Sequence, residues 1–411
     1  MTTSRIFLAS LITVSVIATG CSSTSSQAAA VSPSPFLPAP SPKSSPKPSA
    51  TPSPTPTKAS CTTTVFDRMT EAERVGQLFL VGIPVDGGPG VQAADAIRDH
   101  HLGSVLFSGN STQGVKAITI ITSQVQALTQ STAGVKFLVA ANQEGGEIQP
   151  LKGPGFEPIP TALAQGSMSA QALQSAAETW GRELRQAGVN LDLAPVLDVV
   201  PPGTAAQNAP IGALDREFGD NPRTNGEHGV AFIRGMAEAG VATTAKHFPG
   251  LGRVRGNTDF TANVVDDQTT ADDPYLASFQ SAIDAGVPLV MVALATYTRI
   301  DPDHLAVFSA RIIQGILRDR MHFTGVVISD DLGEAAAVEK LAPGTRAIDF
   351  LTAGGDMVTS QTVPSAIAMD EAVLGHAEAD AAFRGDVSTA VMKILGLKQS
   401  YGLLPCLPDV Q

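Results

Sequence analysis

The sequence predicts one α/β domain in which short buried strands alternate with helices, and three observations support this fold class. Apolar runs recur between residues 78 and 359, and they are short and dense, as in parallel strands that are buried on both faces. Segments between the runs, such as 173–187, repeat apolar residues at helical spacing. Several helical segments end in Ala-Gly-Val, where glycine provides a left-handed cap and the following residues open a strand.

The number of these units predicts how the sheet is arranged. Eight β/α units favour a closed (β/α)8 barrel, and an open doubly wound sheet is the alternative. Charged side chains at the carboxyl ends of successive strands are the layout of a barrel active site. The eight predicted strands are 78–83, 104–108, 137–141, 191–199, 242–247, 289–294, 326–329 and 357–359, and the polar residues at their ends include Asn142, Glu144, Asp198, Lys246, His247, Asp330 and Asp331.

Residues 1–21 have the pattern of a signal peptide. Arg5 is the only charge before the apolar run 6–18, which is too short to cross a bilayer and fits the apolar region of a secretory signal. The run ends at Ala18-Thr19-Gly20-Cys21, which resembles a bacterial lipoprotein cleavage box. We therefore expect an exported protein that a lipid at Cys21 anchors to the outer face of the cytoplasmic membrane, facing the cell wall. The alternative is an ordinary signal peptide with a chance cysteine.

Residues 22–60 are predicted to be a disordered tether. They are almost entirely Ser, Pro, Ala, Thr and Lys, so they cannot bury enough apolar surface to offset the entropy cost of ordering the chain. We expect this segment to lift the folded domain, residues 61–411, away from the membrane.

The charge of the folded region argues against some partners. The chain has a net charge of −12, and its first 60 residues hold four basic and no acidic residues, which leaves −16 for the rest. An acidic domain without a basic stripe repels nucleic acid, so a neutral or cationic sugar fits better. The scattered histidines and three cysteines show no metal-ligand spacing, so we predict no metal and no cofactor. We expect a monomer.

Two cysteines remain if Cys21 carries a lipid. Cys61 and Cys406 lie at the two ends of the folded region, and the termini of a barrel lie near each other. Export permits disulfides, so we predict that these two form one, with two free thiols as the alternative.

Two segments bring reactive side chains to strand ends. Asp330 and Asp331 follow a buried strand, and only one of two adjacent side chains can point into the barrel mouth. A carboxylate there could be a nucleophile, a metal ligand or a helix cap. Lys246-His247-Phe248-Pro249-Gly250 predicts a loop that approaches a ligand closely, and a surface loop with incidental charges is the alternative.

Several blocks together resemble glycoside hydrolase family 3, in particular its β-N-acetylglucosaminidases and their exported lipoprotein branch in actinobacteria. The blocks follow the family's order across most of residues 70–360, and they are 143–146, 190–199, 216–222, 246–250 and 328–332. The resemblance implies a retaining mechanism with Asp330 as the nucleophile. It also implies that Lys246, His247 and Arg216 bind the hydroxyl and N-acetyl groups of the terminal sugar, and that no cofactor is needed.

The sequence departs from the family pattern at two places. The family's acid/base is a histidine of an Asp-x-His element on the loop after the fifth strand, where this chain has Asn257-Thr258-Asp259. Asp259 is our acid/base candidate, because a carboxylic acid with a raised pKa can perform the same proton transfer; a loop-capping role is the alternative. On the third strand, Asn142 replaces the family's sugar-binding Asp, and Glu147 and Pro150 replace two arginines, while Glu144 is retained.

We therefore expect an exported exo-β-N-acetylglucosaminidase that acts on small saccharides or muropeptides from peptidoglycan. A family 3 β-glucosidase or β-xylosidase is a second interpretation, and a degenerate sugar-binding lipoprotein without turnover is a third. The changes at Asn142, Glu147 and Pro150 favour the third interpretation. The retained Asp330, Lys246, His247 and Arg216 oppose it.

Overall fold

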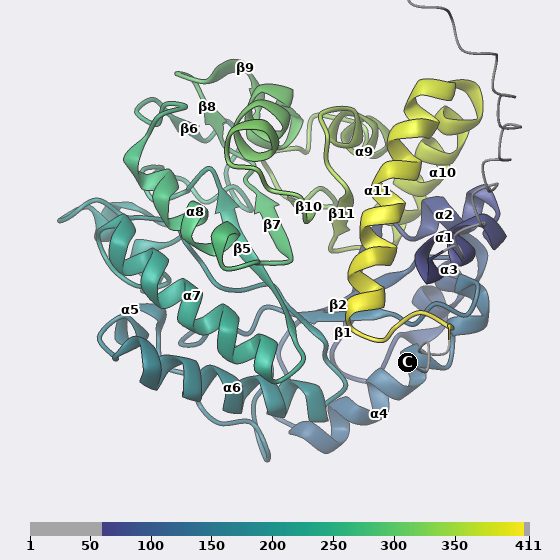
Figure 1. The fold of residues 1–411 in the computed structure, drawn as a ribbon, viewed down its shortest axis with the longest axis horizontal. Helices are drawn as coiled ribbons and strands as arrows, with labels where there is room; N and C mark the ends of the chain where they lie inside the picture. Colours follow the sequence, from purple (N-terminus) through teal and green to yellow (C-terminus); the bar gives the residue numbers. More distant parts are fainter. Residues whose placement is uncertain (1–59, 407–411) are drawn as a thin grey trace, which may run out of the picture. The chain divides into compact units, whose positions relative to one another are not determined.

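The structure is a computed structural model that describes residues 60–406. Eight parallel strands close into a barrel, because β1 pairs with β2 on one side and with β11 on the other (Figure 1). This closure confirms the predicted (β/α)8 barrel and excludes the open sheet. In barrel order the strands are β1 (Phe79–Pro84), β11 (Met357–Ser360), β10 (Val326–Asp331), β7 (Leu289–Val292), β5 (Ala242–Phe248), β4 (Leu191–Asp192), β3 (Leu138–Ala141) and β2 (Ser104–Ser108).

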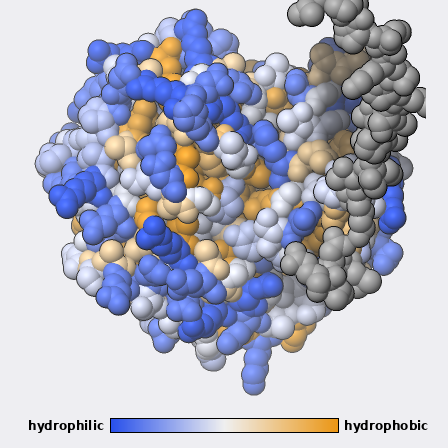
Figure 2. Space-filling view, viewed as in Figure 1, coloured by the Kyte–Doolittle hydropathy of each residue, from blue (hydrophilic) through white to orange (hydrophobic). Residues whose placement is uncertain are grey.

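Helices surround the barrel, and the strands lie inside (Figure 1). The α-helices are α1 (Cys61–Arg68), α2 (Glu71–Gly76), α3 (Gly90–His100), α4 (Val115–Gln126), α5 (Ala162–Gln165), α6 (Ala170–Gln186), α7 (Pro222–Glu238), α8 (Ala277–Asp284), α9 (Pro343–Thr352), α10 (Val363–Ala379) and α11 (Ala381–Ser400). A wider helix spans Arg311–Arg320, and single 3₁₀ turns lie at Thr129–Thr132, Ala205–Gln207, Gly212–Leu214, Pro274–Leu276 and Ala306–Phe308. Hydrophilic side chains cover the periphery of the face in Figure 2, and hydrophobic ones gather toward its centre, where Figure 1 shows strands.

Helix α6 illustrates how the sequence forms a β/α unit. The Ser169 side chain caps the helix by accepting a hydrogen bond from the Ala172 N–H. Leu173, Ala177, Trp180 and Leu184 recur at helical spacing and are buried, and a fully buried leucine contributes about 1.5–3 kcal/mol. The helix stops before Gly188, whose φ of 81° is the left-handed conformation predicted for this cap.

Strand β4 is shorter than predicted, since regular pairing covers Leu191–Asp192 and not 191–199. Pro195 has no N–H for a sheet hydrogen bond, which interrupts the ladder. The chain nevertheless stays beside β5, because Leu197 N–H donates to the Lys246 carbonyl over 2.7 Å. This irregular segment carries Asp198 to the end of β5.

A small second sheet was not anticipated from the sequence. It consists of β6 (Val265–Asp266), β8 (Thr296–Tyr297) and β9 (Asp301–Leu305), which are only two to five residues long. Such short segments carry too little periodicity to distinguish a strand from a loop.

The predicted signal peptide, the lipidation site Cys21 and residues 22–59 of the predicted tether lie outside the described residues. Residues 60–406 lie within one compact unit. Within residues 60–406, no helix is both long enough and apolar enough to cross a membrane.

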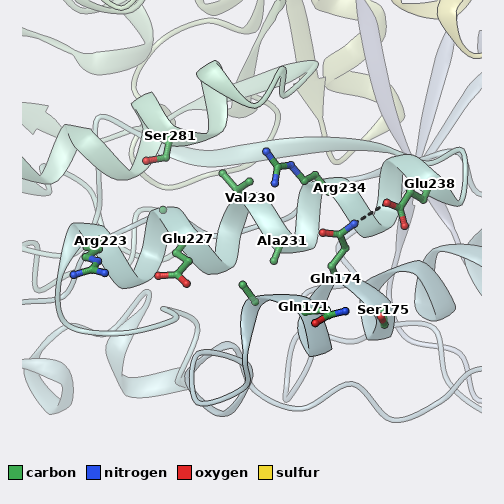
Figure 3. Close-up of a pocket in the computed structure, with 12 residues that line it drawn as sticks. Gln171, Gln174, Ser175, Arg223, Glu227, Val230, Ala231, Arg234, Glu238 and Ser281 are labelled. Carbon is green, nitrogen blue, oxygen red and sulfur yellow. Dashed lines mark hydrogen bonds between the residues drawn. The ribbon is translucent and has the colours of Figure 1, made fainter.

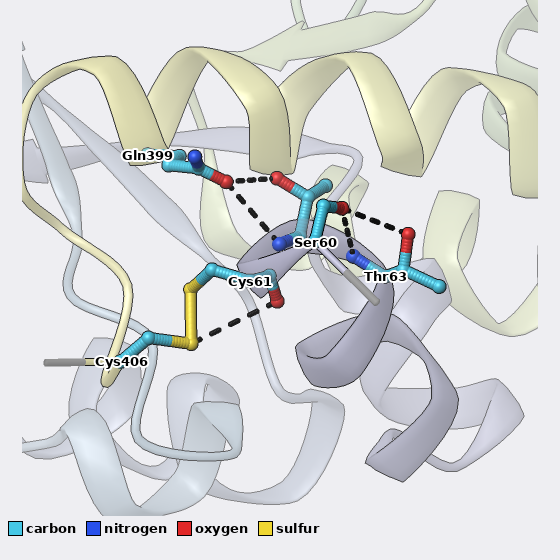
Figure 4. Close-up of a disulfide and its surroundings, with 6 residues drawn as sticks. Ser60, Cys61, Thr63, Gln399 and Cys406 are labelled. Atoms are coloured by element: carbon cyan, nitrogen blue, oxygen red, sulfur yellow. Dashed lines mark hydrogen bonds between the residues drawn. A yellow bond between two sulfur atoms is a disulfide. The ribbon is translucent and has the colours of Figure 1, made fainter. Parts of the chain in front are cut away.

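The two ends of the described region are joined by a disulfide (Figure 4). Cys61 begins α1, and Cys406 follows α11, with 6.0 Å between the two Cα atoms. The same helices are also tied by Thr62, whose N–H donates to Gln399 Oε1 over 3.2 Å. The disulfide therefore closes a covalent loop that contains nearly the whole barrel.

Removal of this bond is expected to destabilise the barrel. For a loop that separates its cysteines by 345 residues, the chain-entropy model gives about 6 kcal/mol. The double variant Cys61→Ala, Cys406→Ala should therefore unfold at lower urea concentration than the parent. Peptide mapping without reductant should recover the two cysteine peptides as one linked species. Two alkylatable thiols in the exported protein would contradict the pairing.

Candidate functional site

A cavity of about 290 Å³ lies at the carboxyl ends of the barrel strands. Its walls include the residues that follow β3, the last residues of β5 and the end of β10. The structure thus brings together all of the catalytic and sugar-binding residues predicted from the sequence. They are Asn142, Glu144, Arg216, Lys246, His247, Asp259 and Asp330.

A buried ion cluster forms one side of this cavity. Both carboxylate oxygens of Glu144 accept hydrogen bonds from Arg216, from Nε over 2.8 Å and from Nη2 over 2.7 Å. Lys246 Nζ lies 2.6 Å from Glu144 Oε1 and donates to Asn142 Oδ1 over 2.9 Å. The cluster holds two cationic side chains at fixed positions, where they can donate to the oxygens of a ligand.

The protonation state of Glu144 follows from these contacts. Burial alone would raise the pKa of Glu144, but the charges and hydrogen bonds of Arg216 and Lys246 outweigh it and lower the pKa to about 2. Glu144 is therefore ionised at neutral pH. It compensates one of the two positive charges, and the neutral amide of Asn142 compensates none.

A second buried pair fixes the orientation of His247. Asp198 Oδ2 lies 2.8 Å from His247 Nδ1, and Asp198 Oδ1 accepts from the backbone N–H groups of His247 and Leu251. The Asp198 carboxylate makes Nδ1 the donor, which leaves Nε2 as the ring nitrogen available to a ligand hydroxyl.

The structure distinguishes the two adjacent aspartates at the end of β10. Asp331 accepts hydrogen bonds from three backbone N–H groups, those of Gly333, Glu334 and Gln361, so it caps the turn that follows the strand. Among the residues that the structure describes, Asp330 accepts only from the Asp331 N–H, and it is half-buried in the cavity wall. Of the two, Asp330 has the carboxylate that is available to react.

Asp259 lies at the mouth of the same cavity, on the loop after β5. Although the residue is exposed toward the mouth, desolvation by its surroundings and the negative charge of Asp330 raise the pKa of Asp259. The positive charges of Arg216 and Lys246 lower it by less. A raised pKa favours the protonated form, as a general acid requires.

The loop that carries Asp259 is held in place at several points. Arg253 donates to Asp273 over 2.6 Å and stacks 4.1 Å from the Tyr275 ring centroid. Asn208 donates to the carbonyls of Leu251 and Val254 over 2.8 and 2.6 Å. The structure therefore shows this loop docked, with Asp259 at the cavity.

Sequence reasoning missed Asp192 as part of the site. It is fully buried, one carboxylate oxygen accepts from the Gln143 N–H over 2.9 Å, and the other has no partner within the described residues. Burial raises the pKa of Asp192 to about 7, against the opposing effect of Lys246. Its position inside a predicted strand gave no sign of which side chains would surround it.

A larger hollow of about 710 Å³ lies on the outer helical layer and contains none of the predicted residues. Figure 3 shows it between α6 and α7, with the Gln174 amide donating to Glu238. Its walls are mostly charged or amide side chains on exposed helix faces. No group of three His, Cys, Asp or Glu side chains that could hold a metal ion occurs among residues 60–406.

Comparisons with known proteins identify a family for this chain. Residues 70–395 match the family described as "Glycosyl hydrolase family 3 N terminal domain". A β-hexosaminidase of Xylella fastidiosa is 34% identical over 254 residues, which cover 60% of this chain and 72% of that protein. A β-hexosaminidase of Methylococcus capsulatus is 34% identical over 273 residues, 65% of this chain and 77% of that protein.

Solved structures of family 3 and related hexosaminidases are also similar to this chain. The crystal structure of a β-N-acetylhexosaminidase from Beutenbergia cavernae is 46% identical, has a TM-score of 0.79, and aligns with 80% of this chain and 99% of its own. A family 3 β-N-acetylglucosaminidase from a Paenibacillus species is 26% identical with a TM-score of 0.73, over 84% of this chain and 65% of its own.

Replacing Glu144 should destabilise the protein. In Glu144→Gln, Lys246 and Arg216 lose the carboxylate that both of them contact, and removing one partner of a buried ion pair costs about 3–5 kcal/mol. The pKa of Glu144 is lowered in the folded state. The contribution of its ionised carboxylate to the free energy of unfolding is therefore complete above the ordinary pKa of 4.5, and it is lost as the pH falls toward about 2.

Urea unfolding at pH 7 and at pH 3 measures this effect. The difference in unfolding free energy between the parent and Glu144→Gln should be smaller at pH 3 than at pH 7. Glu147→Gln is a matched control, because Glu147 is on the same segment and does not line the cavity. An equal difference at both pH values would show that the charge of Glu144 is not what stabilises the cluster.

Proposed function

Because the chain belongs to glycoside hydrolase family 3 and is a glycosidase, we propose that it is a retaining exo-β-N-acetylglucosaminidase that removes terminal N-acetylglucosamine from peptidoglycan fragments. The observation that carries the proposal is the convergence of Asp330 and Asp259 on one cavity in different environments. Most retaining glycosidases use two carboxyl groups, one ionised to attack and one protonated to assist departure.

The first step forms a covalent intermediate. An Asp330 carboxylate oxygen attacks the anomeric carbon, and the bond from that carbon to the leaving oxygen breaks. Asp259 gives its proton to the leaving oxygen, so the aglycone departs as a neutral alcohol. Asp330 is then bonded to the sugar as an ester, and Asp259 is ionised.

The second step releases the sugar. The Asp259 carboxylate takes a proton from water, the water oxygen bonds to the anomeric carbon, and the bond to Asp330 breaks. Two displacements at the same carbon retain the β-configuration. Both carboxyl groups return to their starting protonation states.

The ion cluster supplies the sugar-binding donors. Lys246 and Arg216 are held by Glu144, and His247 is held by Asp198, so these side chains need little reordering when a ligand binds. We assign to them the hydroxyl and N-acetyl groups of the terminal sugar. Asn142 presents a neutral amide and accepts from Lys246.

The same proposal includes export and anchoring through lipid at Cys21, facing the cell wall. The pattern of residues 1–21 supports it. The Cys61–Cys406 bond supports export independently, because structural disulfides persist in oxidising compartments and are rare in the cytosol. A cell-wall location brings the enzyme to peptidoglycan fragments.

A panel of aryl β-glycosides tests the activity. The parent should hydrolyse the N-acetylglucosaminide far faster than the glucoside or the xyloside. Asp330→Ala should lower turnover by about 10³-fold or more while its unfolding curve stays that of a folded protein. Faster turnover of the glucoside or xyloside would assign a different sugar. No turnover of any of the three would favour a sugar-binding protein, which the neutral Asn142 would suit.

Replacing Asp259 should separate substrates by leaving group. Protonation of the leaving oxygen matters most when that oxygen is basic, so Asp259→Ala should slow cleavage of disaccharides far more than cleavage of activated aryl glycosides. The measurement is kcat/KM for both substrate types in parent and variant. Equal losses on both would place the acid/base elsewhere.

Water should be the acceptor in the second step. An ionised Asp259 repels an incoming phosphate by several kcal/mol per charge pair at about 4 Å and an effective dielectric constant near 20, and it does not repel water. Added phosphate should therefore neither speed turnover nor yield a sugar 1-phosphate. Acceleration by phosphate would contradict the assignment of a carboxylate to this position.

A further inference from the structure

The residue after Asp259 has an unusual environment for its type. Phe260 is 84% exposed, the highest value among the large hydrophobic side chains of the described residues. It also lines the cavity that holds Asp259 and Asp330. A phenyl ring in water carries a hydrophobic cost, which a ligand that covers the ring would remove.

The backbone that carries this ring is held firmly. Asp259 N–H donates to Asn257 Oδ1 over 2.9 Å, and Phe260 N–H donates to the Asn257 carbonyl over 3.1 Å. From the loop after β10, Ala336 N–H donates to the Asp259 carbonyl, and Ala337 N–H donates to the Thr258 carbonyl, each over 3.1 Å. These bonds fix Phe260 at the cavity mouth beside the acid/base.

We infer that Phe260 is the platform of an aglycone subsite, on which the first ring of the leaving group stacks. The inference rests on the proposed function, because it takes Asp259 to be the group that protonates the leaving oxygen. A general acid must lie within hydrogen-bond reach of that oxygen. The aglycone therefore begins next to Asp259, at the place where the next residue presents its ring.

The size of the cavity supports an arrangement in which the terminal sugar lies inside and the leaving group lies at the mouth. At about 290 Å³, it lies at the lower end of the range for ligand pockets, which suits one sugar residue inside. The charged donors Lys246 and Arg216 and the nucleophile Asp330 line that interior. A second residue of the substrate then lies at the rim.

The chemistry of the platform indicates what it binds. In a pyranose of gluco configuration the hydroxyl groups are equatorial, so axial C–H groups form an apolar face that can cover a phenyl ring. A phosphate or a small alkyl alcohol has no apolar face large enough to cover the phenyl ring. We therefore assign to this subsite a pyranose ring, so the substrate is at least a disaccharide.

Two substrates that share the glycone test the inference. N,N′-diacetylchitobiose has a pyranose aglycone, and N-acetylglucosaminyl fluoride has only a fluoride leaving group. Phe260→Ala should lower kcat/KM for the disaccharide about ten-fold, as loss of one aromatic contact predicts, and change it less than about two-fold for the fluoride. Phe260→Trp should retain activity on both substrates.

Val91→Ala is the matched control, because Val91 is 79% exposed and does not line the cavity. It should leave both substrates unchanged. If Phe260→Ala lowers kcat/KM equally for the disaccharide and the fluoride, or lowers it for neither, Phe260 is not the platform of an aglycone subsite. If the parent hydrolyses the fluoride, the proposed function stands whatever Phe260→Ala shows. If the parent cleaves neither substrate, the proposed function fails, and the inference fails with it.

Discussion

The buried carboxylate of Glu144 is the contact on which the arrangement of the site depends. It follows β3, yet its two oxygens bind Lys246 from the end of β5 and Arg216 from the segment before α7. Three stretches of chain that lie far apart in the sequence therefore meet at one group. Removing one partner of a buried ion pair leaves the other charge buried without compensation, which costs several kcal/mol of stability. Separating these segments would carry this cost.

The charge balance around this group shapes what the cavity can bind. Two cations share one fully ionised carboxylate, and Asn142 adds a hydrogen-bond acceptor without adding charge. Asp192 lies buried nearby, and burial raises its pKa to about 7, so its charge is only partly present at neutral pH. The interior therefore presents strong donors to sugar oxygens. Asp330 and Asp259, the proposed catalytic carboxyl groups, line the same cavity.

The environments of these two carboxyl groups suit different roles. Asp330 follows a buried strand and is held by one backbone N–H, while its neighbour Asp331 is occupied by three. Asp259 lies on a docked loop where desolvation and the charge of Asp330 raise its pKa. The cavity thus holds two carboxyl groups in different environments, which suits the proposed nucleophile and acid/base, and Phe260 follows Asp259 on the same loop.

Much of the fold could be predicted because barrel strands leave a direct signal in the sequence. Dense apolar runs marked all eight strands, and polar residues at their ends marked the cavity. Strand β4 was predicted too long, because apolar content does not reveal that Pro195 interrupts hydrogen bonding.

Contacts between distant segments could not be predicted from local pattern. Nothing in the sequence shows that Ala336 holds Asp259, or that one carboxylate oxygen of the buried Asp192 has no hydrogen-bond partner among residues 60–406. Nor does the sequence show that Phe260 remains exposed at a cavity while other phenylalanines are buried. The choice of Asp330 over Asp331 rested on resemblance alone until the backbone contacts of Asp331 were visible.

Covalent trapping of the intermediate tests the central claim most directly. A 5-fluoro N-acetylglucosaminyl fluoride should form the glycosyl-enzyme and slow its release, so that digestion and mass spectrometry locate the ester. The account predicts the label on Asp330, with loss of labelling in Asp330→Ala. A label on Asp331 or on another residue, or turnover without any trapped ester, would contradict it.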